Sequence, residues 1–191
     1  LHDGLDTWHK KAEGKAAIDY GFHLAITDLT DKVMAEIPSL VADGVTSLKL
    51  FMAYKGVLQV DDTTLFKAML KSAEAGMLTM VHAENGDAID VLVKDALAKG
   101  NVAPIYHALT RPEWCEVEAT NRAVMLAGVA KAPLYVVHMT CEGALDMLRY
   151  GRERGFPVMG ETCVQYLFFT QEHLASPGFE GAKWVCSPPM R

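Results

Sequence analysis

The sequence predicts an α/β fold of consecutive β/α units with parallel strands. Two observations support this class. Residues that begin and end helices lie between strand-like segments, and short strands that alternate with helices are joined by crossovers, which make neighbouring strands parallel. The strand-like segments are five short apolar stretches, residues 20–27, 48–54, 78–83, 134–139 and 158–166.

The helical segments are marked at their ends by specific residues. Pro38 divides the first segment, and we expect the helix to break there. After the second strand, residues 61–64 offer N-cap side chains, and Gly76 stands where a helix-terminating glycine is expected. A long insert, residues 85–111, follows the third strand, and a helix opens at Pro112 with acidic residues in its first turns.

The last unit repeats this pattern. Thr140 can cap the helix after the fourth strand, and that helix is expected to end near Gly155. The strands are apolar on both faces, as in a sheet that helices cover. Periodicity alone leaves two architectures open, an open doubly wound sheet and part of an eight-stranded barrel. The sequence has no glycine-rich dinucleotide motif and no P-loop, which counts modestly against the nucleotide-binding folds.

Composition and charge exclude several classes of function. The chain has 191 residues, 50% hydrophobic and 22% charged, enough for one core. A net charge of −6 offers no basic surface to nucleic acid or an anionic membrane. No apolar run approaches the roughly 20 residues of a membrane span, and no signal peptide is visible. The four cysteines are widely spaced without a CxxC pair, which indicates reduced thiols and a cytoplasmic location.

One charged residue lies inside an apolar strand. Lys49 interrupts the segment Ser-Leu-Lys-Leu-Phe-Met, and strand alternation puts it on one face with Phe51. A lysine there is costly unless its charge is removed or paired. One interpretation is an edge-strand lysine that extends to solvent. The other is a desolvated, neutral amine, which can capture carbon dioxide and become a carbamate able to bridge two metal ions.

Two histidines stand at the ends of successive strands. His82 follows the third apolar strand and His138 follows the fourth. Taken singly, each is more often a satisfied core residue than a ligand. With Lys49 one unit earlier, all three would converge on the C-terminal face of a β/α barrel, where active sites lie. Neutral imidazole is the form that binds zinc and related metals.

The remaining polar residues give weaker signals. Tyr54 lies past the end of its strand, where a phenol could donate to a developing oxyanion or be an ordinary interfacial tyrosine. Ser187, followed by two prolines, marks a turn. His107 and Arg111 are expected to order the long insert, and we assign them no chemistry. His23 could be a core residue.

Five segments resemble motifs of one known family, the dihydropyrimidinases and D-hydantoinases, which are cyclic amidohydrolases. They follow in the family's order and at its spacing, so that the resemblance covers nearly the whole chain. The lysine-bearing and histidine-bearing segments are the most specific. The segments are residues 47–55, 81–87, 135–138, 160–163 and 186–189.

The resemblance implies a (β/α)₈ TIM barrel of the amidohydrolase type with two divalent metal ions, usually zinc. Lys49 would be the N6-carboxylated lysine that bridges both metals, with carbon dioxide held as its carbamate, whereas neighbouring Lys55 lies beyond the strand. His82 and His138 would bind the second metal. Tyr54 would polarise the ring carbonyl, and the main chain of Ser187 would hold the substrate.

The implied activity is ring opening. A hydroxide that bridges the metals would hydrolyse the cyclic amide of dihydropyrimidines or 5-substituted hydantoins to N-carbamoyl amino acids. Members of the family are commonly tetramers, so we expect a homo-oligomer. Its ligand would be a small cyclic amide substrate, and we expect it to bind neither nucleic acid nor a membrane.

The resemblance also implies that this chain is incomplete. The chain starts at Leu1 without an initiator methionine and stops at Arg191, just after an apolar run. Residues 1–191 would form one partial catalytic barrel, roughly strands three to seven of an α/β barrel. Strands one, two and eight, with the family's His-x-His pair and late aspartate, would lie outside it. We expect the isolated fragment to be inactive and to hold metal weakly.

Three alternatives compete with this interpretation. Collapsin response mediator proteins share the fold but are non-enzymatic and have lost metal ligands, whereas Lys49, His82 and His138 are all present here. An allantoinase or dihydroorotase would share the site, but residues 82–87 are closer to dihydropyrimidinases and hydantoinases. A structural α/β module with coincidental histidines would not explain five motifs in order.

Overall fold

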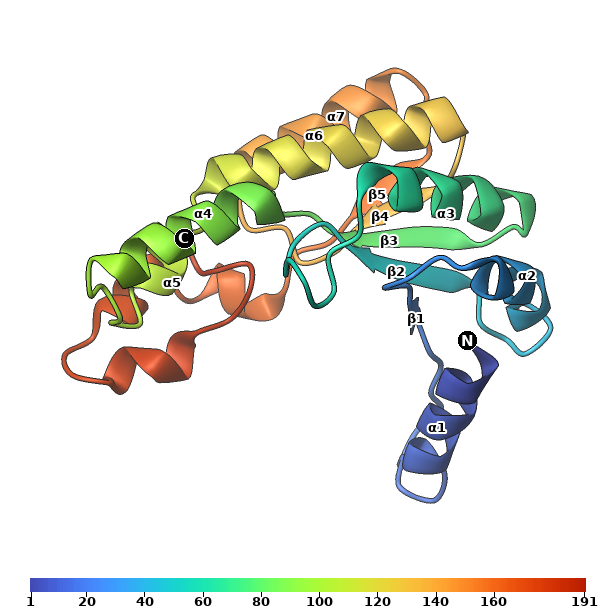
Figure 1. The fold of residues 1–191 in the computed structure, drawn as a ribbon, viewed down its shortest axis with the longest axis horizontal. Coiled ribbons are helices and arrows are strands. Elements are labelled where there is room, and N and C mark those ends of the chain that lie inside the picture. Colours follow the sequence, from blue (N-terminus) through green and yellow to red (C-terminus); the bar gives the residue numbers. More distant parts are fainter.

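One sheet of five parallel strands organises the molecule (Figure 1). The computed structural model describes all 191 residues. The strands lie side by side in the order in which they occur along the chain. An open doubly wound sheet reverses its strand order at a switch point, and this sheet does not. The strands are β1 (Leu24–Ala25), β2 (Ser47–Phe51), β3 (Leu78–His82), β4 (Leu134–Val136) and β5 (Val158–Gly160).

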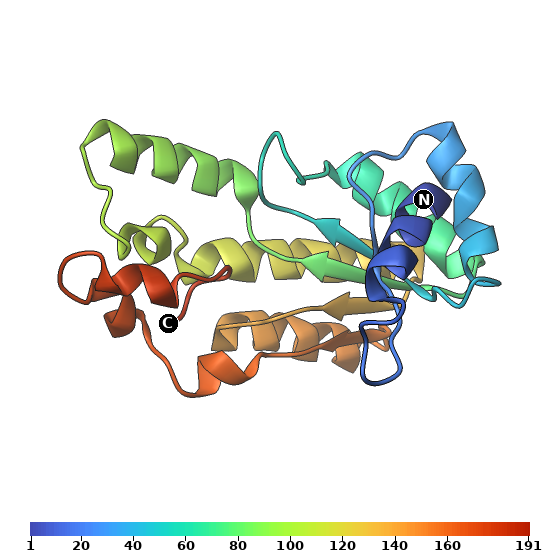
Figure 2. The ribbon, with the colours of Figure 1, turned by 90° about the horizontal axis from the view of Figure 1, so that it is seen from below.

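Helices connect successive strands, as predicted. Three of them, α3, α6 and α7, lie along one face of the sheet, as Figures 1 and 2 both show. None of the helices is both long and apolar enough to cross a bilayer. The helices are α1 (His2–Ala12), α2 (Asp31–Leu40), α3 (Asp62–Glu74), α4 (Gly86–Ala98), α5 (Tyr106–Leu109), α6 (Glu113–Ala130) and α7 (Glu142–Glu153), with short 3₁₀ helices at Val164–Leu167, Gln171–Ala175 and Glu180–Trp184.

The two faces of the sheet differ, which corrects the expectation that helices cover both. Leu48 and Leu50 of β2 point toward the helices and are completely buried in the main hydrophobic core. Lys49 and Phe51 point the other way and are only half-buried. That face lines a cavity of about 710 Å³. In a closed β/α barrel this would be the interior face. One face of the strands is therefore apolar because helices cover it, and the other because it would line the barrel interior.

Most helix boundaries agree with the sequence signals. Asp61 caps α3, because its carboxylate accepts a hydrogen bond from the Thr64 N–H at 2.7 Å. Gly76 ends the same helix with a φ of +70°, a conformation that favours glycine. α6 begins directly after Pro112. Gly155 follows α7 with a φ of +77°.

Two helix predictions are wrong. α2 runs through Pro38 to Leu40 without a break. Pro38 lies in the last turn, where it removes only one hydrogen bond, and the completely buried Ile37 and Leu40 hold that turn in the core. Thr140 does not cap α7, which follows Cys141 and has no side-chain cap. The Thr140 N–H and hydroxyl both donate instead to Glu116.

Several segments differ in length or content from the prediction. The strands predicted at 48–54 and 134–139 end at Phe51 and Val136. The strand predicted at 20–27 is only the two residues of β1, paired with Leu48 and Lys49 on a single side. The strand predicted at 158–166 ends at Gly160, because the chain turns into the 3₁₀ helix at Val164–Leu167. The long insert contains α4 and α5, and α5 lies beside the C-terminal segment in both views (Figures 1 and 2).

Gly86, the first residue of α4, lies against the loop that follows β2. A Cβ atom there would lie 2.1 Å from the Gln59 side-chain oxygen and 2.6 Å from the Ala53 Cα, and the latter belongs to the backbone. We expect Gly86→Ala to lower the free energy of unfolding by about 1–3 kcal/mol, the usual cost of overpacking. Gly4→Ala, with open space around Gly4 in α1, is the matched control. Equal urea midpoints for the two variants would contradict the close approach.

Candidate active site

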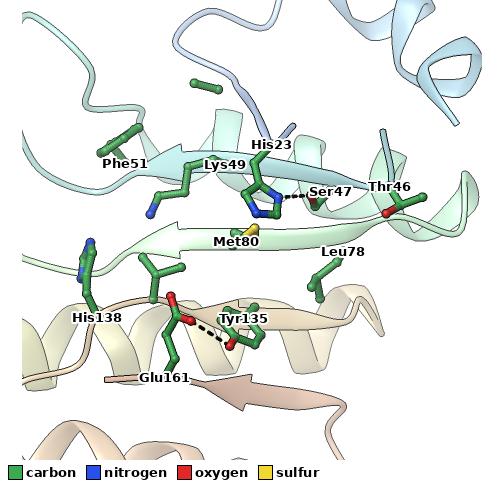
Figure 3. A pocket seen from close by; sticks show the side chains of 12 residues that line it. His23, Thr46, Ser47, Lys49, Phe51, Leu78, Met80, Tyr135, His138 and Glu161 are labelled. Atoms are coloured by element: carbon green, nitrogen blue, oxygen red, sulfur yellow. Dashed lines mark hydrogen bonds between the residues drawn. The ribbon is translucent and has the colours of Figure 1, made fainter. Parts of the chain in front are cut away.

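The lysine and both histidines singled out from the sequence converge at the carboxyl ends of neighbouring strands. In the register of the sheet, Phe51 is opposite His82, and Lys49 lies two residues earlier on the same face. His138 follows β4 on the other side of β3. Figure 3 shows the Lys49 amine extending across the cavity toward the His138 ring. Parallel strands bring these distant residues together because their carboxyl ends share one edge of the sheet.

The two imidazoles are in direct contact. The His82 Nδ1 atom lies 3.0 Å from the His138 Nε2 atom, and the ring planes are inclined by 71°. The other nitrogen of His82, Nε2, lies 2.7 Å from a carboxylate oxygen of Glu84. His82 and Glu84 are each only 1% exposed, so both side chains depend on partners inside the protein.

One ring nitrogen of this histidine pair has no hydrogen-bond partner. A carboxylate oxygen accepts, so the His82 Nε2 atom is the donor in the contact with Glu84. Burial, together with the neighbouring His82 and Lys49, lowers the pKa of His138 to about 3, so its ring is neutral. The His138 Nδ1 atom is buried and has no hydrogen-bond partner. Imidazole nitrogens are metal ligands, and here ring nitrogens of two histidines face each other at 3.0 Å.

Lys49 has the properties of a desolvated amine. β2 lies between β1 and β3, so the alternative of an edge-strand lysine is wrong. The amine lies 5.2 Å from the centre of the Phe51 ring. Burial lowers the pKa of Lys49 to about 8, although Glu161 and Cys163 act in the opposite direction. A substantial fraction of the amine is therefore neutral near physiological pH.

Tyr54 stands in a strained turn beside the histidine pair. Its φ is +69°, which is uncommon for a residue with a side chain. The Tyr54 carbonyl accepts from the N–H groups of Val57, Leu58 and Gln59 at 3.0 to 3.2 Å, and these bonds hold the turn. The Tyr54 and His82 ring centroids are 5.0 Å apart. Burial raises the pKa of the Tyr54 hydroxyl, and a hydrogen bond with Ser187 opposes this.

The structure also brings Ser187 to the same place. Tyr54 and Ser187 are neighbours although the sequence separates them widely. The Ser187 hydroxyl lies 3.0 Å from the His107 Nε2 atom, so the insert and the C-terminal segment meet at the rim of the site. His107 and Arg111, which we expected to order the insert, are in contact with each other at 3.2 Å.

Sequence reasoning missed two carboxylates of the site. Glu84 lies two residues after His82, and its contact with that ring could have been expected from alternation along the strand. Glu161 follows β5 at a strand end like those of the two histidines, and it accepts a hydrogen bond from the Tyr135 hydroxyl at 3.1 Å. Figure 3 shows Glu161 pointing into the same cavity as Lys49.

The donor set of this chain fits part of a metal site. No cluster of three or more histidine, cysteine, aspartate or glutamate side chains is present. The chain contributes two imidazoles and one amine, and the amine becomes a carboxylate-like oxygen ligand once it is carboxylated. Such a set suits a divalent metal ion whose remaining ligands come from elsewhere.

Comparisons with known proteins point to one group of enzymes. No family model matches the chain. The D-hydantoinase of Geobacillus stearothermophilus is 53% identical over 192 residues, a match that covers 100% of this chain and 41% of that protein. The D-hydantoinase of Streptomyces coelicolor is 54% identical over 191 residues, with the same coverage of 100% and 41%.

Solved structures give the same result. A crystal structure of D-hydantoinase superposes with a TM-score of 0.98 at 56% identity and covers 100% of this chain and 42% of that chain. The dihydropyrimidinase from Brevibacillus agri also superposes with a TM-score of 0.98, at 55% identity and with the same coverage. These likenesses confirm the predicted α/β class and the partial barrel.

Fold and site together define a section of a β/α barrel whose strand ends hold two imidazoles and a desolvated lysine. The comparisons add the relatives. Over its whole length the chain is homologous to proteins named D-hydantoinase and dihydropyrimidinase, as the sequence motifs indicated. It spans 41% of the length of the curated relatives it matches.

Proposed function

We propose that this chain is the central section of a longer, metal-dependent enzyme that opens the ring of dihydropyrimidines or 5-substituted hydantoins to N-carbamoyl amino acids. The observation that supports this best is the convergence of Lys49, His82 and His138 at adjacent strand ends. Barrel strands one, two and eight would come from outside residues 1–191, together with a His-x-His pair and a late aspartate.

Lys49 would provide the ligand shared by two metal ions. Its neutral amine would attack the carbon of carbon dioxide, so that a nitrogen–carbon bond forms while one C=O π bond breaks and its electron pair moves onto oxygen. The nitrogen would then release one proton to solvent. The product is an anionic carbamate, so the buried cation disappears and a bridging carboxylate-like group takes its place. His82 would bind through Nδ1 and His138 through Nε2, the atoms that face each other at 3.0 Å. Imidazole and carboxylate ligands suit zinc.

The substrate would be held and polarised by this chain's own residues. Two divalent metal ions, when bound, supply Lewis acidity and a water-derived nucleophile near neutral pH. Tyr54 keeps its proton because burial raises its pKa, so it can donate to the carbonyl oxygen as negative charge develops there. The main chain of Ser187 would hold the cyclic amide. The late aspartate would carry the proton to the leaving nitrogen.

The test is an assay of ring opening by the complete protein that contains this chain, with zinc and bicarbonate present. We expect turnover of dihydrouracil, of a 5-substituted hydantoin, or of both, and the ratio of the two rates gives the preferred ring. Bound metal without turnover of either ring would contradict this substrate class and favour allantoin or dihydroorotate. Absence of both metal and turnover would favour a non-enzymatic, collapsin-response-mediator-like role.

The carboxylation of Lys49 should depend on pH. With a pKa of about 8, the neutral amine fraction rises from roughly 1% at pH 6 to about half at pH 8. In metal-free protein at constant dissolved carbon dioxide, we therefore expect carbamate formation to accelerate strongly over this range. Carbon-13 NMR with labelled bicarbonate measures it. A rate that stays flat between pH 6 and 8 would argue against a lowered lysine pKa.

Assembly and location are further parts of the proposal. We propose a homo-oligomer, a tetramer by family resemblance, which light scattering on the complete protein would test. A cytoplasmic location is supported by the four cysteines, all of which are free thiols. The isolated 191-residue chain is expected to show no ring opening and weak metal binding, because most ligands of the first metal would be missing.

A further inference from the structure

His107 joins two segments that are far apart in the sequence. It lies in α5, and its Nε2 atom is 2.8 Å from the Cys186 carbonyl oxygen and 3.0 Å from the Ser187 hydroxyl. The other ring nitrogen, Nδ1, lies 3.2 Å from a guanidinium nitrogen of Arg111. The imidazole is therefore engaged on both sides, with about eighty residues of chain between the groups that it connects.

These contacts define the protonation of the His107 ring. A guanidinium group only donates, so the Nδ1 atom accepts from Arg111. A carbonyl only accepts, so the Nε2 atom carries the proton and donates to Cys186. Burial first, and then the charge of Arg111, lower the pKa of His107, which agrees with a neutral ring. Only one tautomer of the neutral ring satisfies both partners.

The segment after Val185 is held from a second side as well. The Tyr166 hydroxyl donates to the Pro188 carbonyl at 2.7 Å. On the far side of His107, the Arg111 carbonyl accepts from the Arg191 guanidinium at 2.7 Å. The main chain at Ser187 thus lies between an imidazole and a phenol, and the Ser187 side chain is a neighbour of Tyr54. Its position depends on groups outside the metal-binding strand ends.

We propose that His107, oriented by Arg111, is a positioning residue that holds the Cys186–Ser187 main chain in the geometry that recognises the amide edge of a cyclic substrate. This inference rests on the proposed function. His107 does not touch Lys49, His82 or His138, so it would act on substrate binding and leave metal content unchanged. Through His107, the long insert would contribute to binding of the cyclic substrate.

A pair of substitutions separates this role from general stability. The amide nitrogen of glutamine can occupy the place of the His107 Nε2 atom and donate to Cys186, whereas asparagine is too short and mimics Nδ1 instead. In the complete zinc-loaded protein, we expect His107→Asn to raise KM roughly tenfold, because the variant loses one or two neutral hydrogen bonds. His107→Gln should restore KM, with kcat and metal content unchanged in both variants.

A second measurement does not need turnover. Hydrogen–deuterium exchange of residues 184–191 should be faster in His107→Asn than in the wild type, and close to wild type in His107→Gln. If the wild type opens no cyclic amide, the proposed function fails. The rate of hydrogen–deuterium exchange then decides by itself whether His107 positions residues 184–191. Unchanged KM and exchange in His107→Asn would overturn the inference. Equal defects in both variants, or loss of metal and kcat, would overturn it as well.

Discussion

Replacing Lys49 by alanine in the complete protein is expected to remove metal and activity together. Lys49 is the residue that we propose as the bridge between two metal ions, and even partners that only orient a ligand change affinity or activity by roughly 10- to 100-fold. We expect a fall in kcat/KM of more than about 100-fold. Ring opening measured with metal analysis of the same sample tests this, and full activity with full metal content would refute the assignment.

Lys55 provides the matched control for Lys49. It lies only six residues further along the chain, but it is exposed and forms an ion pair with Asp87 at 2.5 Å. Exposed ion pairs contribute little, so Lys55→Ala should retain its metal and most of its activity. Mass spectrometry under non-denaturing conditions adds a direct readout, because the mass of one carbon dioxide should be present in Lys55→Ala and absent from Lys49→Ala.

Replacing Tyr54 by phenylalanine should reduce kcat by about 10²- to 10³-fold, the usual effect of removing one donor to a developing oxyanion. The ring would keep its packing against His82 and Phe51, so the variant should fold and bind metal normally. Steady-state kinetics would show the loss mainly in kcat, because the hydrogen bond strengthens as charge develops in the transition state.

Tyr135→Phe is the control for the loss of a phenol. Tyr135 lines the cavity into which Lys49 and His138 point, and its hydroxyl donates to Glu161 and not to either histidine. Its kcat should stay within a few-fold of the wild type. Similar losses in both variants would show that Tyr54 has no special role in polarising the carbonyl.

Much of the fold follows from local sequence signals. Asp61 and Gly76 mark the ends of α3 because a capping carboxylate and a positive φ act within a few residues. Pro38 and Thr140 were misjudged because non-local contacts outweigh local preference. The buried side chains around Pro38 hold α2 together, and the buried Glu116 takes both donors of Thr140.

Local sequence signals identified some residues of the candidate site, whereas others are brought together only by non-local contacts. Lys49 could be preferred over Lys55 because strand alternation is a local property, and His82 and His138 stood out at strand ends. Glu84 and Glu161 were overlooked although each occupies a comparable position. No local signal could place Tyr54 against Ser187, since a turn with φ +69° and a distant segment had to be brought together.

The sequence by itself determined the β/α order, most helix ends and the three residues at the strand ends, because backbone periodicity and capping act over a few residues. Only the tertiary structure decided that the lysine-bearing strand is internal, that the two imidazoles face each other at 3.0 Å, and that His107 holds Ser187. Those features depend on contacts between residues up to about eighty positions apart. Such contacts form only when the sheet aligns its strand ends and buried polar groups must find partners.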